Sequence, residues 1–137
     1  AAGLCRVVML HHPPRSGPAA HLRGLRDAPA LRDILAREGA ELVIHGHDHR
    51  DQQGRIARLP DIAGPPVPVI GAASASAAAQ HHGEPPARYN VYDVSGAPGA
   101  WTISCTVRGL MQPLGVVGKI ASFAVTGGAH EISLSEA

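Results

Sequence analysis

The 137-residue chain is predicted to fold as an α/β protein in which a βαβ unit is followed by antiparallel strands. Two short apolar runs, at residues 5–10 and 41–44, predict strands, and a helical pattern lies between them. Further along, two alternating runs flank a Gly/Pro turn, which predicts an antiparallel hairpin. These observations together indicate a mixed fold.

The first strand is predicted over residues 5–10 (CRVVML), a nearly continuous apolar run with β-branched valines. Such a run is typical of a strand that is buried on both faces of a sheet. Pro13 and Pro14 end it. Residues 15–26 then mix Gly, Pro, Ser and arginine without periodicity, so they predict a surface loop.

A helix is predicted between Asp27, a suitable N-cap, and Gly39, which ends it. Pro29 is tolerated in the first turn. One face of the helix carries three apolar residues, Leu31, Ile34 and Leu35. The second strand follows at residues 41–44 (ELVI). A crossover of this length joins parallel strands right-handedly, so the carboxyl ends of both strands are expected at the same edge of the sheet.

The second half predicts further strands. Pro65, Pro66 and Pro68 surround apolar residues and indicate an edge or entry strand, because proline cannot donate to a ladder. Alternation over 89–94 and 101–107 predicts the hairpin. Residues 111–137 form a weakly patterned tail in which 115–125 (GVVGKIASFAV) is compatible with one last strand.

Composition narrows the class of protein. Hydrophobic residues make up 45% and charged residues 17% of the chain, which is typical of a globular protein, and no apolar run predicts a membrane span. The net charge of +1 offers no polybasic field for nucleic acid or an anionic membrane surface. Cys5 and Cys105 lie in apolar runs, so we expect reduced core thiols and a cytoplasmic protein.

Histidine is the residue type that points to chemistry, since the chain has nine of them. His11 and His12 follow the first predicted strand, and the sequence HGHDH, residues 45–49, follows the second. Ligand sites of such sheets gather outside the carboxyl ends of parallel strands. Because neutral imidazole is the commonest side-chain metal ligand, we expect a metal site there.

The run RVVMLHHPP followed by ELVIHGHDHR carries an H-x-P motif, His11-His12-Pro13, and a G-H-x-H motif, Gly46-His47-Asp48-His49. With these motifs, residues 5–108 resemble the C-terminal half of a calcineurin-like metallophosphoesterase. The resemblance implies part of an αββα four-layer sandwich. Residues 1–137 would then form a single, incomplete domain of this family.

The resemblance also implies roles for individual residues. His11 and His47 would bind one of two divalent ions (Mn, Fe or Zn), and His49 would bind the other. His12 would contact substrate or orient a ligand, whereas His45 is expected to be structural. Arg15 and Arg23 would hold oxygens of a small phosphate ester, either a phosphomonoester or a phosphodiester.

The chain departs from the family pattern, because the motifs D-x-H, G-D-x-x-D and G-N-H-D/E do not occur. No acidic residue precedes His11, so the bridging carboxylate is missing. We therefore expect little catalysis from this chain alone and consider a missing N-terminal half as a partner. The alternatives are a non-catalytic metal-binding or partner-binding remnant and a metallo-β-lactamase-like hydrolase, which HGHDH also resembles.

Overall fold

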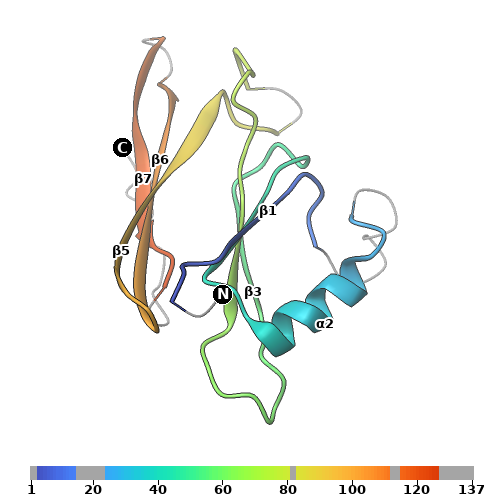
Figure 1. Ribbon diagram of the computed structural model, residues 1–137. Coiled ribbons are helices and arrows are strands. Elements are labelled where there is room, and N and C mark those ends of the chain that lie inside the picture. Colours follow the sequence, from blue (N-terminus) through green and yellow to red (C-terminus); the bar gives the residue numbers. More distant parts are fainter. Residues whose placement is uncertain (1–2, 15–23, 81–82, 112–114, 127–137) are drawn as a thin grey trace. The chain divides into compact units, whose positions relative to one another are not determined.

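The computed structural model describes residues 3–14, 24–80, 83–111 and 115–126, and this part of the chain is α/β, with two sheets and one helix (Figure 1). The chain divides into two compact units. One comprises Cys5–Ala73, and the other comprises Ala1–Leu4 with Ser74–Ala137. The predicted α/β class is confirmed at this level.

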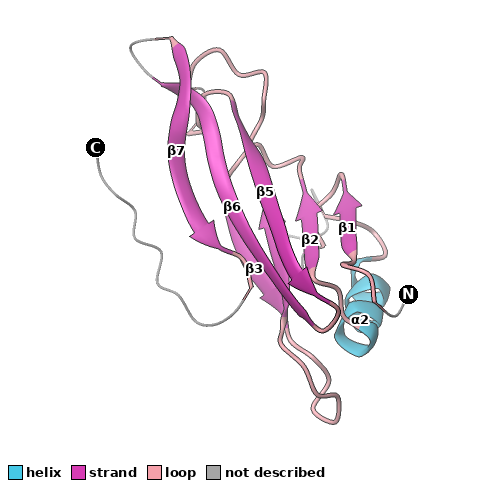
Figure 2. Ribbon diagram, turned by 60° about the vertical axis from the view of Figure 1, so that its left-hand side comes forward, coloured by secondary structure: helices cyan, strands magenta, loops and turns pink. Residues whose placement is uncertain are grey.

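The unit Cys5–Ala73 contains a four-stranded sheet in the order β1-β2-β4-β3. Its strands are β1 (Val7–Leu10), β2 (Leu42–His45), β3 (Gln52–Ile56) and β4 (Val67–Gly71). β1, β2 and β4 run parallel, and β3 pairs antiparallel with β4. The predicted parallel βαβ unit is therefore confirmed, and the carboxyl ends of β1 and β2 lie side by side (Figure 2).

Helix α2 (Ala28–Glu38) connects β1 and β2 and packs on one face of this sheet (Figure 1). It ends as predicted at Gly39, whose φ of 76° is a left-handed conformation that suits glycine and whose N–H donates to the Leu35 carbonyl oxygen at 2.9 Å. Apolar side chains from the helix and three strands form the core: Leu35, Ala36, Val43, Ile56, Val67 and Val69. This core fixes the sheet beneath the two histidine-bearing strand ends.

The first strand differs from the expectation that it is buried on both faces. Val8 and Leu10 pack against the core, whereas Val7 is 47% exposed and Met9 is 81% exposed. The prediction was wrong because β1 is the edge strand of its sheet and α2 covers only the face that carries Val8 and Leu10.

The proline-flanked segment was predicted as an edge or entry strand; β4 lies between β2 and β3, so it is no edge, but Pro65 and Pro66 directly precede its first residue, Val67. The parallel pairing with β2 begins at Val69, which lies opposite Val43. Pro68 precedes that pairing, so its missing N–H removes no bond from it. The edge next to β4 is β3, a strand that the sequence analysis missed because Gln52–Ile56 carries only one apolar side chain, Ile56.

The other unit contains a three-stranded antiparallel sheet, β5 (Arg88–Ala97), β6 (Ala100–Met111) and β7 (Val116–Ala124). The predicted hairpin is confirmed, with Ala97 opposite Ala100 at its turn. In β6 every second side chain is buried, at Ile103, Cys105 and Val107, as the alternating sequence predicted. β7 is the last strand suggested within residues 111–137, and residues 127–137 lie outside the described part of the chain.

Two further expectations concern cysteines and membranes. Neither Cys5, which is half-buried, nor Cys105, which is buried, forms a disulfide within the described residues. Among the helices of the described ranges, none is long and apolar enough to cross a membrane.

Candidate metal centre

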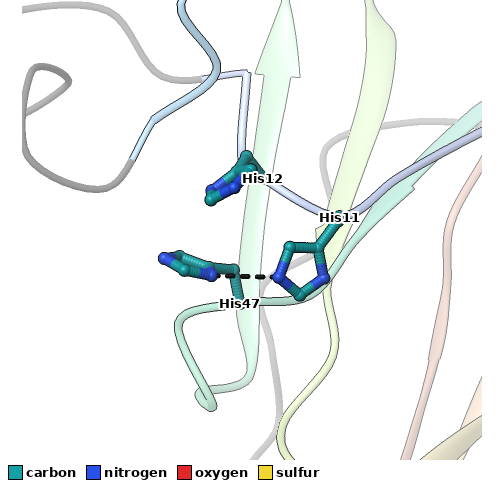
Figure 3. A group of neighbouring side chains, drawn as sticks. All are labelled: His11, His12 and His47. Carbon is teal, nitrogen blue, oxygen red and sulfur yellow. Dashed lines mark hydrogen bonds between the residues drawn. The ribbon is translucent and has the colours of Figure 1, made fainter.

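Three histidines meet just beyond the carboxyl ends of β1 and β2. Leu10 lies opposite His45 in the parallel register, so the segments that follow these two residues leave the sheet together. His11 and His12 come from the first segment and His47 from the second (Figure 3). One ligand nitrogen from each ring lies within 4.8 Å of the others. We call His11, His12 and His47 the histidine group.

The spacing inside the histidine group suits a shared metal ion. His47 Nδ1 lies 3.1 Å from His11 Nε2, and the rings of His12 and His47 have their centroids 4.1 Å apart (Figure 3). Two nitrogens bound at about 2.05 Å to one tetrahedral ion would be separated by about 3.3 Å. The pair His11–His47 is therefore close to ligand spacing without a large rearrangement.

The backbone after β2 has an unusual shape that places His47. The φ of His47 is 69°, a left-handed conformation that a side-chain-bearing residue adopts only at a cost of about 1–2 kcal/mol. Two backbone bonds hold this turn, from Gly46 N–H to the His11 carbonyl oxygen at 3.2 Å and from Asp48 N–H to the Gly46 carbonyl oxygen at 2.9 Å. The first of these bonds ties the two strand-end segments directly together.

Buried polar side chains support the same turn. His45 is 4% exposed, and its Nδ1 lies 3.2 Å from the Gly46 carbonyl oxygen. Asp48 is 7% exposed and accepts a hydrogen bond from Gln52 Nε2 at 3.1 Å. His45 lies outside the histidine group.

The structure brings together part of the predicted ligand set. His11 and His47, expected to share one ion, lie side by side, and His49, expected at the other ion, is exposed and lies outside the histidine group. His12, predicted only as a neighbour or substrate contact, provides the third nitrogen. The predicted substrate residues Arg15 and Arg23 lie outside the described residues.

His12 could have been recognised from the sequence by one signal. Adjacent residues point to opposite faces only within a strand, and β1 ends at Leu10. Beyond Leu10 the side chains of His11 and His12 need not point to opposite faces of the sheet, so both rings can turn toward His47.

Three imidazoles define what this arrangement can bind. Neutral imidazole suits Zn, Cu, Fe and Ni, whereas Mg and Ca prefer oxygen ligands. Three protein ligands with one open coordination position are typical of catalytic zinc sites. Within the described part of the chain, the histidine group includes no carboxylate.

Comparison with known proteins does not identify this site, so its chemistry is inferred from its geometry. No protein-family model matches the chain, and no curated protein matches it significantly.

Proposed function

We propose that the chain binds a divalent transition-metal ion through the histidine group and that this ion serves a metal-dependent phosphoesterase. The observation that supports the proposal is the meeting of His11, His12 and His47 beyond two parallel strands, with their ligand nitrogens within 4.8 Å. The reaction class comes from the resemblance of His11-His12-Pro13 and Gly46-His47-Asp48-His49 to the H-x-P and G-H-x-H motifs.

The chain's own residues have distinct parts in this proposal. The three histidines hold the ion, and the Gly46–His11 backbone bond keeps the two segments in register. If bound there, a divalent ion would supply Lewis-acid chemistry to a phosphate ester and to water. The Asp48–Gln52 hydrogen bond stiffens the turn that presents His47.

The full centre implied by the resemblance holds two ions, Mn, Fe or Zn, with His49 as a ligand of the second. A bridging carboxylate would have to come from outside the histidine group, so we propose that this chain alone hydrolyses phosphate esters slowly. A small phosphomonoester or phosphodiester is the proposed substrate, and a missing N-terminal half the proposed partner. Part of an αββα sandwich is the fold that we propose from the family resemblance. Cys5 and Cys105 form no disulfide within the described residues, which favours a cytoplasmic location.

Calorimetric titration of the purified chain with Zn²⁺ or Mn²⁺ tests the metal proposal. We expect one ion to bind, and His11→Ala or His47→Ala to weaken binding at least tenfold, because each removes one of three ligands. His49→Ala is the matched control from the same loop. It leaves this ion bound, and it lowers the stoichiometry only if a second ion binds. Unchanged affinity in His11→Ala and His47→Ala would refute the histidine group as a metal site.

Hydrolysis of p-nitrophenyl phosphate and bis-p-nitrophenyl phosphate tests the reaction class. We expect slow turnover that requires added metal, stops with a chelator and is lost in His47→Ala. Tight metal binding without any turnover, even after addition of an upstream segment carrying the three absent motifs, would favour a non-catalytic metal-binding module. The all-imidazole composition of the described histidine group is the observation that keeps this second candidate in view.

A further inference from the structure

The ligand atoms of the histidine group bear on two properties of the proposed centre, the kind of ion that binds and the charge of the phosphate ester. The ligand nitrogens of His11, His12 and His47 lie within 4.8 Å of one another, and His47 Nδ1 is 3.1 Å from His11 Nε2 (Figure 3). Each ligand atom in the group is therefore an imidazole nitrogen, and imidazole binds a metal ion in its neutral form.

Carboxylates do not contribute to this group in the described part of the chain. Residues 11–26, which follow β1, include no acidic residue in the sequence. Asp48 and Asp51, which follow β2, lie outside the group, and Asp48 is buried and accepts a hydrogen bond from Gln52 Nε2. Three neutral ligands therefore leave the charge of a bound divalent ion uncompensated within the group.

His12 belongs to a segment that the fold holds in place. Pro13, directly after it, is buried, and the Pro13 carbonyl oxygen accepts a hydrogen bond from Leu25 N–H at 3.2 Å. A proline also restricts the backbone of the residue before it. The ring centroid of His12 lies 4.1 Å from that of His47 and 4.9 Å from that of His11. The group therefore offers three imidazole nitrogens rather than two.

A set of imidazole ligands alone favours particular ions and anions. Imidazole suits Zn²⁺, Cu²⁺ and Ni²⁺, whereas Mn²⁺ and Mg²⁺ are suited to carboxylate, carbonyl and water oxygens. The uncompensated charge of the ion attracts a dianion more strongly than a monoanion. A phosphomonoester carries nearly two negative charges at neutral pH, and a phosphodiester carries one.

We infer that the histidine group selects Zn²⁺, or an ion with the same preference for nitrogen, over Mn²⁺, and that the loaded site binds a phosphomonoester in preference to a phosphodiester. The inference rests on the proposed metal centre and narrows both its ion and its substrate. Both preferences have one origin, the three imidazoles, so replacing one imidazole with a carboxylate changes them together.

Calorimetry of the wild-type chain at pH 8 measures the first preference. We expect Zn²⁺ to bind at least about 100-fold more tightly than Mn²⁺, because Mn²⁺ has the lowest affinity of the divalent first-row ions for such ligands. Equal affinity for the two ions would overturn the inference.

The Co²⁺-loaded chain measures the second preference, since its visible absorption changes when a ligand enters the coordination sphere of the ion. The probes are phenylphosphonate, a dianion at pH 8, and its methyl ester, a monoanion. We expect phenylphosphonate to bind at least about tenfold more tightly. Equal binding of the two probes, or equally tight binding of phenylphosphonate to the metal-free chain by calorimetry, would overturn the inference.

His12→Asp replaces one imidazole with a carboxylate, and we expect it to reduce both affinity ratios by at least about threefold. Arg50→Gln is the matched control, because Arg50 is exposed, follows the same strand as His47 and lies outside the group. It also lowers the charge by one and should keep both ratios within about twofold. If circular dichroism shows that His12→Asp is unfolded, the two wild-type ratios decide the matter.

The remaining outcomes separate the inference from the proposed function. Equal changes in His12→Asp and Arg50→Gln would show that the charge of the surroundings, rather than the imidazole ligands, sets the preferences, and would overturn the inference. Unchanged Zn²⁺ affinity in His11→Ala and His47→Ala would remove the metal centre, and the inference with it. If both binding preferences hold but no phosphate ester is hydrolysed, the proposed reaction is rejected and the inference stands.

Discussion

Backbone strain is concentrated at the candidate metal centre. His47 has a φ of 69° and His49 a φ of 54°, and within the described ranges these are the non-glycine residues with positive φ. Such conformations cost energy and persist where surrounding contacts enforce them, often at functional sites. Both lie in the G-H-x-H segment, so the strain coincides with the residues that the sequence motif singled out.

The strain at His49 predicts a stability difference between two substitutions. His49→Gly and His49→Ala both remove the imidazole, but only glycine adopts positive φ without a steric cost. We expect His49→Gly to have a free energy of unfolding about 1 kcal/mol greater than that of His49→Ala, measured by urea denaturation. Equal stability of the two variants would show that the left-handed conformation is absent in solution.

Gly71 predicts a second effect at the residue scale. A Cβ added there would lie 2.7 Å from His45 Cε1 and 3.0 Å from Gln52 Cβ, closer than packed atoms approach. We expect Gly71→Ala to lower the free energy of unfolding by about 1–3 kcal/mol through this overpacking, measured by thermal or urea denaturation. Gly54→Ala is the control, because its Cβ would meet nothing nearer than the Val69 carbonyl oxygen at 4.0 Å. A similar loss in both variants would contradict the packing argument.

At the scale of elements, one ion pair joins the start of β1 to the start of β2. Arg6 Nη2 donates to Glu41 Oε1 at 3.0 Å and Arg6 Nε donates to Glu41 Oε2 at 3.1 Å, a two-point contact. Arg6 Nη1 also donates to the carbonyl oxygen of Glu38, at the end of α2, at 2.9 Å. The side chain of Arg6 therefore fastens three elements at the end of the sheet opposite the histidine group.

This ion pair predicts a pH dependence of stability. Burial raises the pKa of Glu41, but hydrogen bonds from Arg6 and its charge outweigh that effect, so the pKa of Glu41 is lowered overall. A carboxyl group whose pKa is lowered by folding stabilises the protein above its unfolded pKa of about 4.3 and loses this contribution as the pH falls through the folded value. We expect Glu41→Gln to be about 1 kcal/mol less stable than the wild type at pH 7, with the difference vanishing near pH 3.

Denaturation of both proteins across that pH range measures the effect. Glu38→Gln is the control, since its side chain is exposed and the Arg6 guanidinium bonds to the backbone carbonyl oxygen of Glu38, which the substitution keeps, and it should show less than half of the difference at pH 7. A Glu41→Gln deficit that stays constant down to pH 3 would show that the carboxylate charge is not the source.

The elements differ in how far the sequence predicts them. Helix α2 was predictable because Pro29 and Gly39 mark its ends locally. Strand β3 was not, because its residues acquire strand geometry from pairing with β4 rather than from a hydrophobic pattern of their own. Pro68 did not reveal that β4 is an internal strand, because whether its missing N–H removes a bond to β2 depends on the register in which β4 pairs with β2.

The candidate site, too, could be predicted from the sequence only in part. The meeting of His11 with His47 follows from parallel topology, which the spacing of the two motifs predicts. Which histidines of HGHDH turn inward depends on the left-handed residues in that loop, and no residue type in the sequence announces them. His49 received its role as a ligand of the second ion by resemblance, and because it lies outside the histidine group, that role stays a prediction.

At the scale of the whole molecule, the two units differ in what they contribute to the proposed function. The histidine group lies in Cys5–Ala73, on the segments that directly follow β1 and β2. The unit containing Ser74–Ala137 is built on the antiparallel sheet β5-β6-β7. Ligand binding should therefore stabilise the first unit directly.

Hydrogen exchange followed by mass spectrometry tests this separation. A ligand that binds only the folded state stabilises it by about 2.7 kcal/mol at 100 times its dissociation constant, and the gain slows exchange in segments whose opening breaks the site. With Zn²⁺ we expect slower exchange in peptides covering residues 9–14 and 42–49, and little change in peptides from β5, β6 and β7. His47→Ala should abolish the Zn²⁺ effect, whereas His49→Ala should retain it in both peptides. Equal protection of both units would contradict the predicted separation, because it would show that the two units open together.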